Sequence, residues 1–353
     1  MVTIGVDAHK RIHVALALDD AGREIGEWQG RNSVAGWRDV SQWASGFEGE
    51  RQWGIEGAWG YGRGLAQHLV ERGETVFEIN PRWTAAGRRR ARKPGKTDRL
   101  DARAVALFVR QEAPLLPVVR TEDDSATLNL LSTERDQVSA EIVRLRNQIH
   151  ALIVHVDPEY QSRLPVLKSR SGLAALEAYD APGDHPVQLE RAAAVRRLAR
   201  RLALAVEQID ELTDRIRTAA QTRFSPLTGL CGVNFLTAGM LAGILGPGRR
   251  FANDAQLAAY AGVAPLETSS AGLMRHRLNR GGNRRLNAIV HRIALTQARH
   301  SSEARSYLER RVSEGKSRRE AIRALKRFIV RAIWRLWLEC EPNSAAHSME
   351  IAA

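Results

Sequence analysis

The sequence is poor in cysteine and contains no apolar run long enough to cross a membrane. Its two cysteines, Cys231 and Cys340, cannot build a disulfide framework or a zinc site, and no CxxC pair occurs. The most apolar stretch, residues 235–246, is well short of the roughly 20 residues that span a bilayer. The first residues, VTIGVD, read as a strand and not as a secretory signal. We therefore expect a soluble cytoplasmic protein that spans no membrane.

Lysine is also scarce, although positive charge is abundant in this chain of 353 residues. Lys and Arg number 53 against 40 Asp and Glu, which gives a formal net charge of +13 and a pI near 10.5. Only 6 of these cations are lysines. The codon bias of a GC-rich genome explains the preference for arginine, but it does not explain an excess of cations over anions. Because a positive field attracts polyanions, we expect nucleic acid as partner, ahead of an acidic membrane surface.

The first 120 residues alternate between strand-like and helix-like patterns. Strands are predicted at residues 2–6, 12–18, 24–28, 51–55 and 75–79, and helices at residues 34–45 and 60–72. This order predicts an α/β domain over residues 1–120 that opens with an antiparallel meander.

The hydrophobic period changes to that of a coiled-coil seam after residue 128. Arg135 is the one polar interruption of the first run, and a proline-bearing stretch separates it from the second. The seam positions are Leu131, Val138, Ile142, Leu145, Ile149, Leu152 and Val156, then Val195, Leu198, Leu202, Ala205, Ile209, Leu212, Ile216 and Ala219. We predict an antiparallel helical hairpin over residues 121–222. The period fits an internal helix pair and a dimer interface equally well.

Four carboxylates lie where predicted strands end or a helix begins: Asp7, Glu56, Asp98 and Asp101. If a helix starts near Thr97, Asp98 and Asp101 extend its apolar stripe toward the sheet. Helix capping explains one acid there, but it gives no reason for two. Like charges converge only when a cation neutralises them, so we expect Mg²⁺ or Mn²⁺ and metal-assisted phosphodiester chemistry.

A helical, basic region follows over residues 223–340, and residues 341–353 form a frayed tail. Gly229 and Gly232 resemble a helix-hairpin-helix turn, whose backbone N–H groups bind phosphate; a plain glycine-rich connection is the alternative. Asn283 is predicted to cap the next helix. The candidate nucleic-acid ligands are Arg275, Arg277, Arg280, Arg284 and Arg285, and a second basic face is predicted at Arg323, Lys326, Arg327, Arg331 and Arg335.

Ser269 and Ser270 stand just before this arginine cluster. A serine can attack phosphorus and hold a DNA end covalently if cations stabilise the charge and a base accepts its proton. His276 and His291 are candidates for the base. The alternative for each serine is a turn-forming role, and for each histidine a packing role.

The motifs GVDAHK, IEGAWGYG, INP and KTDRLDA, followed by GLCGVNFLTA, RFANDAQLAAYAGVAP and RLNRGGNRRLN, resemble in order and spacing those of DEDD-type insertion-sequence transposases, the IS one-hundred-ten family. The resemblance implies an RNase H-like (RuvC-like) domain whose metal ligands are Asp7, Glu56, Asp98 and Asp101, a helical linker, and a C-terminal transposase domain. It also implies a serine nucleophile that forms a 5′-phosphoserine link to DNA.

In that family the serine stands five residues after a proline, which points to Ser270, five residues after Pro265. It commonly precedes glycine, whereas Ala271 follows here, so Ser269 is the second choice. The resemblance further implies donor and target DNA, a structured guide RNA (bridge RNA) encoded by the element, and a homodimer or tetramer. RNA pairing would then read the DNA sequence.

Two other functions fit the residues. The first is a junction-resolving nuclease in which a metal-activated water attacks and Ser270 is structural. The second is a nucleic-acid-binding scaffold without catalysis, which would not require the inward-facing Asp98 and Asp101.

Overall fold

The computed structural model describes residues 1–81, 83–84, 97–248, 250–264, 266–267, 276–277 and 281–341. Two compact units are present: one comprises Met1–Ala126, Pro226–Val233 and Ile244–Ala353, and the other Thr127–Ser225 and Asn234–Gly243. In the described residues, no helix combines the length and the apolar character that crossing a bilayer requires.

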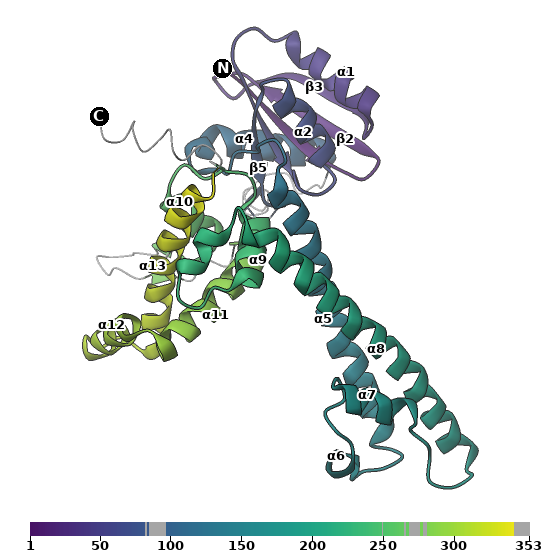
Figure 1. The fold of residues 1–353 in the computed structure, drawn as a ribbon. Helices are drawn as coiled ribbons and strands as arrows, with labels where there is room; N and C mark the ends of the chain where they lie inside the picture. The colour runs from purple at the N-terminus through teal and green to yellow at the C-terminus, as the bar shows by residue number, and fades with distance from the viewer. Residues whose placement is uncertain are drawn as a thin grey trace. The chain divides into compact units, whose positions relative to one another are not determined.

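A five-stranded sheet in the order β3-β2-β1-β4-β5 forms the centre of the N-terminal part (Figure 1). Its strands are β1 (Val2–Ala8), β2 (Ile12–Leu18), β3 (Glu24–Arg31), β4 (Arg51–Glu56) and β5 (Thr75–Ile79). β2 runs antiparallel to both β1 and β3, whereas β1, β4 and β5 are parallel. The predicted α/β order that opens with an antiparallel meander is therefore confirmed.

Helices cover both faces of this sheet. One face packs against α1 (Val34–Ser45) and α2 (Arg63–Glu71), and the other against α4 (Asp98–Glu112). Gly5 and Gly54 let α4 approach closely: a Cβ on Gly5 would lie 2.2 Å from the Ala102 carbonyl oxygen. At Gly5 the backbone of β1 therefore meets the backbone of α4, while Gly54 of β4 makes room for the side chains of Val105 and Val109.

The helix predicted at residues 60–72 begins later, at Arg63. Residues 57–62 form turns instead, in which Gly57 has a φ of +70° and its carbonyl accepts from the N–H groups of Gly60 and Gly62. A glycine adopts this left-handed conformation without strain, so the turn directly after Glu56 displaces the helix start.

The second unit contains the long helices α5 (Asp124–Ile153) and α8 (Pro186–Gln221) and the short α6 (Tyr160–Arg163) and α7 (Arg170–Glu177). Arg135 Nε donates to Thr213 Oγ1 at 2.8 Å, and Gln188 Nε2 donates to the His155 carbonyl at 3.2 Å. Helices α5 and α8 therefore run antiparallel within one chain. Most seam residues are buried, but Ala219 is exposed and its neighbour Ala220 is buried instead.

The remainder of the described chain is predominantly helical, as predicted. It contains α9 (Phe235–Leu245), α10 (Asp254–Tyr260), α11 (Arg284–His300), α12 (Ser302–Ser313) and α13 (Arg318–Glu339). Two short antiparallel strands, β6 (Leu266–Glu267) and β7 (His276–Arg277), lie between α10 and α11 in sequence. Asn283 caps α11 as expected, since its side chain accepts from the N–H of Leu286.

Candidate metal centre

Asp7 and Glu56 lie opposite each other at the ends of two adjacent parallel strands. The register of β1 and β4 pairs Gly5 with Gly54 and Asp7 with Glu56. Because side chains alternate along a strand, both carboxylates project to the face that α4 covers. Asp7 is only 5% exposed, and Glu56 accepts a 2.9 Å hydrogen bond from the hydroxyl of Thr84.

Helix α4 brings the other two carboxylates to the same face. Thr97 caps it by accepting from the N–H of Leu100, and Asp98 and Asp101 occupy its first turn. Asp101 is buried at 4% exposure beside the apolar stripe. Both acids lie on the Asp7 side of the helix, as predicted, but only Asp101 is buried. The Asp98 side chain is 56% exposed because the helix end extends beyond its packed stripe, although it reaches His9 at 3.4 Å.

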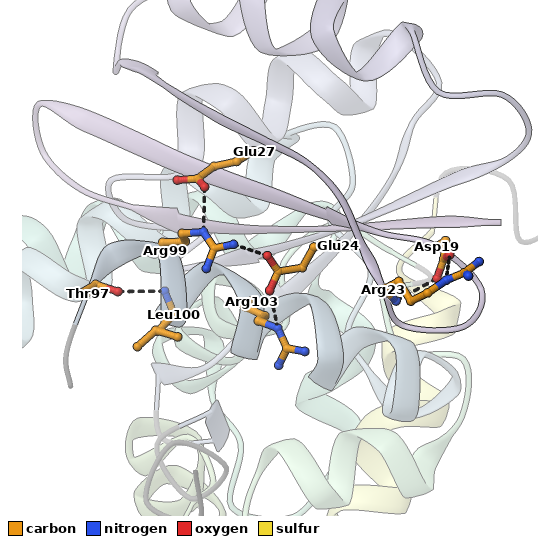
Figure 2. Close-up of polar contacts among 8 residues, drawn as sticks. All are labelled: Asp19, Arg23, Glu24, Glu27, Thr97, Arg99, Leu100 and Arg103. Atoms are coloured by element: carbon orange, nitrogen blue, oxygen red, sulfur yellow. Dashed lines mark hydrogen bonds and ion pairs between the residues drawn. The ribbon is translucent and has the colours of Figure 1, made fainter. Parts of the chain in front are cut away.

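An ionic cluster ties the flank of α4 away from the carboxylates to β3 (Figure 2). Arg99 Nε donates to Glu27 at 2.7 Å and Arg103 Nε to Glu24 at 2.8 Å, while Arg99 also binds Glu24. Both acids belong to β3, one of the two edge strands. Since Arg99 and Arg103 stand one turn apart on one flank, Asp101 is directed to the other flank, toward β1 and β4.

His9 joins this group, although the sequence pattern did not predict it. Its Nε2 lies 3.1 Å from Asp7 Oδ2 and 3.4 Å from Asp98 Oδ1. One ligand atom from each of these three residues lies within 4.8 Å of the others. Its position two residues after Asp7 in GVDAHK could have indicated this contact, because side chains two residues apart lie on one side of an extended chain.

The electrostatics of Asp7 fit a cation site. Burial raises the pKa of Asp7 to about 6; His9 opposes this rise, whereas Glu56, Asp101 and Asp98 add to it. Three other carboxylates are thus close enough to penalise the charge on Asp7. A divalent cation would relieve that repulsion. Carboxylate oxygens suit Mg²⁺ and Mn²⁺, and an imidazole donor would favour Mn²⁺ over Mg²⁺.

The residues proposed to bind nucleic acid are only partly described. Ser269, Ser270, Arg275 and Arg280 lie outside the described residues, and Arg277 is described in its backbone alone, within β7. Arg284 is exposed and Arg285 half-buried in the first turn of α11. Gly232 has a φ of +91° and lies against Thr296 of α11, and Gly229 ends a 3₁₀ turn.

The predicted basic face of α13 is largely used inside the fold. Lys326 is buried and donates to Asn287 Oδ1 at 2.6 Å. Arg327 and Arg331 both bind Asp254. Burial, with Arg323 nearby, lowers the pKa of Lys326. Only Arg323 and Arg335 of that predicted set remain exposed without an ion pair to a described acid.

Comparison with known proteins agrees with this geometry. The profile of the DEDD transposases of IS110, described as Transposase, matches residues 4–158, and that of the Transposase IS116/IS110/IS902 family matches residues 225–309. The chain is 25% identical to the insertion element IS116 uncharacterized 44.8 kDa protein of Streptomyces clavuligerus, over 94% of each chain. It is also 25% identical, over 94% of each chain, to the insertion element IS900 uncharacterized 42 kDa protein of Mycobacterium paratuberculosis.

A third relative carries a functional name. The chain is 26% identical to the transposase for insertion sequence element IS1328 of Yersinia enterocolitica, over 59% of each chain. The first matched profile spans all four carboxylates, and the second spans the serines and the arginine cluster. The chain belongs to the IS110 family of insertion-sequence transposases and is a DNA transposase.

Proposed function

We propose that this transposase cuts and rejoins DNA at a divalent-cation site held by Asp7, Glu56, Asp98 and Asp101, with His9 beside them. The observation that carries the proposal is the parallel register that sets Asp7 opposite Glu56, together with the buried Asp101 on the helix covering that face. Such carboxylates repel one another unless a cation is bound. Mg²⁺ or Mn²⁺ fits this oxygen-rich set.

We further propose that the N-terminal domain is RNase H-like (RuvC-like). The strand order β3-β2-β1-β4-β5, with β2 as the one reversed strand of that sheet, supports this assignment. So does the position of the acids at the ends of adjacent strands. The active groups then come from three segments that are distant in sequence.

The proposed reaction uses a serine, Ser270 with Ser269 as second choice, on the basis of the family resemblance. Its Oγ forms a bond to phosphorus while the bond from phosphorus to the 3′ oxygen breaks. This leaves a 5′-phosphoserine link and a 3′ hydroxyl, as the serine proton passes to a base and the 3′ oxygen takes up a proton. In rejoining, a 3′ hydroxyl attacks the phosphoserine and releases the serine.

The cation, when bound, would neutralise charge that develops on the phosphate and on the leaving oxygen. The described residues have supporting tasks. Thr84 donates to Glu56 and orients that carboxylate. His9 Nε2 lies between Asp7 and Asp98 and contacts both. Burial beneath α4 keeps water from Asp7 and Asp101 and strengthens their interaction with a cation.

The decisive experiment traps the covalent intermediate. Wild-type protein, incubated with its element's end sequences and Mg²⁺, is resolved on a denaturing gel to detect DNA-linked protein. Ser270→Ala should abolish the adduct, Ser269→Ala should preserve it, and Asp7→Asn should abolish cleavage. If Ser270→Ala cleaves DNA normally and no variant or wild-type sample yields an adduct, a water-based nuclease mechanism replaces this one.

We also propose a guide RNA and a homodimer as partners. The net charge of +13 supports binding to RNA and DNA backbones. Nucleic acid that copurifies with the chain should contain one discrete RNA from the flanks of the element, which sequencing would identify. Light scattering of the RNA-free protein tests the homodimer, and a monomer at micromolar concentration would contradict it.

A further inference from the structure

A buried arginine, Arg250, lies between the N-terminal sheet and the helices that follow. It is 2% exposed, and its Nη1 donates to the carbonyls of Ile244 at 2.9 Å and Leu245 at 3.0 Å. Its Nη2 donates to Glu78 Oε2 and, at 3.2 Å, to the hydroxyl of Tyr260. Glu78 belongs to β5 and Tyr260 ends α10, so one guanidinium joins elements 182 residues apart by sequence number, 78 to 260.

On the sheet side, Glu78 connects Arg250 to the turn that follows Glu56. Trp59, in that turn, donates its indole N–H to Glu78 Oε2 at 3.2 Å, and the Arg250 guanidinium lies 5.4 Å from the Trp59 ring centre. The same turn is tied to β5 by the N–H of Gly57, which donates to the Ile79 carbonyl at 3.3 Å. Arg250 therefore holds, through Glu78, the turn that directly follows Glu56.

On the other side, Tyr260 connects Arg250 to the start of α11. The hydroxyl of Tyr260 accepts from Asn283 Nδ2 at 3.0 Å, and its carbonyl accepts from the N–H of Asn283 at 2.6 Å. Next to this contact, a Cβ on Gly282 would lie 2.3 Å from the N atom of Gly262. The backbone at Gly282 is therefore in direct contact with the backbone at Gly262.

The chain between these two glycines, residues 263–281, carries both candidate serines. A further pair of hydrogen bonds holds the two ends of this segment together. Asn287 Nδ2 donates to the Ala261 carbonyl at 2.7 Å, and Lys326 Nζ donates to Asn287 Oδ1 at 2.6 Å. The ends of the serine-bearing segment are therefore held by the same hydrogen-bonded chain that reaches Glu78.

We propose that Arg250 is a positioning residue that couples the two halves of the reaction centre, the Glu56 turn and the base of the serine-bearing segment. The inference rests on the proposed function for its catalytic meaning, but the coupling itself is a property of the fold. Glu78, Arg250, Tyr260 and Asn283 form one continuous path of charged and polar contacts. A guanidinium suits this task because its rigid fork serves acceptors on both sides at once.

The same sheet offers a matched control. Glu74, just before β5, accepts from the indole N–H of Trp53 at 2.9 Å and from Arg51 at 2.7 Å. Glu74 and Glu78 thus each bind one tryptophan and one arginine, but Glu74 lies at the other end of the strand from the carboxylates. Glu74→Gln therefore reproduces the chemical change of Glu78→Gln without touching the path through Arg250.

The first test measures the coupling without activity. Hydrogen–deuterium exchange of the full chain should show that Tyr260→Phe and Glu78→Gln each accelerate exchange in both residues 57–62 and residues 283–287. Glu74→Gln should leave both segments at wild-type rates. The inference is overturned if Tyr260→Phe affects only residues 283–287, if Glu78→Gln affects only residues 57–62, or if Glu74→Gln has the same effect as Glu78→Gln.

The second test measures the consequence for the reaction in single-turnover cleavage with prebound DNA. Tyr260→Phe should lower the cleavage rate about 10-fold, as a small misplacement of reacting groups does, while DNA affinity stays within about twofold of wild type. Glu78→Gln with Tyr260→Phe should lose little more than either alone, because both act through Arg250. Glu74→Gln should not lower the rate of Tyr260→Phe further.

Failure of the inference and failure of the proposed function are distinguishable. If wild type cleaves without a serine adduct, the mechanism is wrong, and the exchange measurements still decide the coupling. If wild type forms the adduct and Tyr260→Phe cleaves at the wild-type rate, Arg250 has no positioning role. Glu78→Gln leaves the buried Arg250 without its carboxylate and could destabilise the fold. Tyr260→Phe keeps the buried ring and removes only the hydroxyl, so it tests the inference without that disturbance.

Discussion

Replacing Asp7 by asparagine should make the cation-free protein more stable while it abolishes the reaction. Asp7 is 5% exposed, and burial raises its pKa from 3.8 to about 6, with further contributions from Glu56, Asp101 and Asp98. A raised carboxyl pKa means that the folded state disfavours the ionised form. The neutral amide of Asp7→Asn has nearly the same shape and carries none of this penalty.

The magnitude follows from the pKa shift. A change from 3.8 to about 6 is roughly two units, and each unit is worth about 1.4 kcal/mol, so the penalty is at most about 3 kcal/mol. The favourable contact with His9 is already contained in this shift, and solvent screening at the half-exposed His9 side of the site keeps the penalty below that bound. We expect Asp7→Asn to stabilise the protein by about 2 kcal/mol at pH 7.5.

The stability gain of Asp7→Asn depends on pH. Well below pH 3.8, Asp7 is protonated in both the folded and the unfolded wild type, so no ionisation penalty exists there. The penalty grows as pH rises from about 4 to 6 and is complete above that range. The stability gain of Asp7→Asn should therefore be complete at pH 7.5 and mostly lost at pH 4.

Thermal or urea unfolding in EDTA at several pH values measures this difference. Saturating Mg²⁺ should raise the stability of wild type but not of Asp7→Asn, because only a folded cation site gains from ligand binding. Asp98→Asn is the control: its side chain is 56% exposed, so it should change stability by less than about 0.5 kcal/mol. A variant Asp7→Asn that is destabilised at pH 7.5 in EDTA would refute the electrostatic argument.

Three further predictions follow from the same site. Thr84→Val removes the hydroxyl that donates to Glu56 and should slow cleavage about 10-fold, whereas Thr84→Ser should restore it; equal rates in both would show that the contact is irrelevant. His9→Ala should weaken Mn²⁺ binding about 10-fold or more and Mg²⁺ binding less, as calorimetry would measure; an unchanged Mn²⁺ affinity would exclude His9 as a ligand. Gly5→Ala should cost about 3 kcal/mol or more, because its Cβ would lie 2.2 Å from a carbonyl oxygen of α4; a urea midpoint at the wild-type value would contradict that close approach.

Much of the local structure could be predicted because it depends on neighbours in sequence. Alternation of apolar residues predicted β1 and β2, and Thr97 and Asn283 marked helix starts through their capping side chains. The start of α2 was predicted too early, since the left-handed Gly57 adds a turn that hydrophobic spacing does not reveal.

Burial of charged residues was harder to predict. Lys326 and Arg327 repeat at helical spacing with exposed arginines, so the sequence pattern assigned them to a basic surface. Their actual partners, Asn287 and Asp254, come from α11 and α10. Spacing along one helix cannot show what packs against it, and a buried cation needs a partner that only another element supplies.

The sequence by itself determines the order of the secondary-structure elements, the carboxylates at the strand ends and the positive charge. Each of these depends on local periodicity or on composition. Only the tertiary structure decides which residues become neighbours across the fold, because strand register and helix packing bring them together. The examples are His9 with Asp98, Thr84 with Glu56, and Arg250 with Glu78 and Tyr260. Those contacts join residues separated by up to 172 positions, as between Glu78 and Arg250, and depend on how surfaces fit once α4 and α10 are in place.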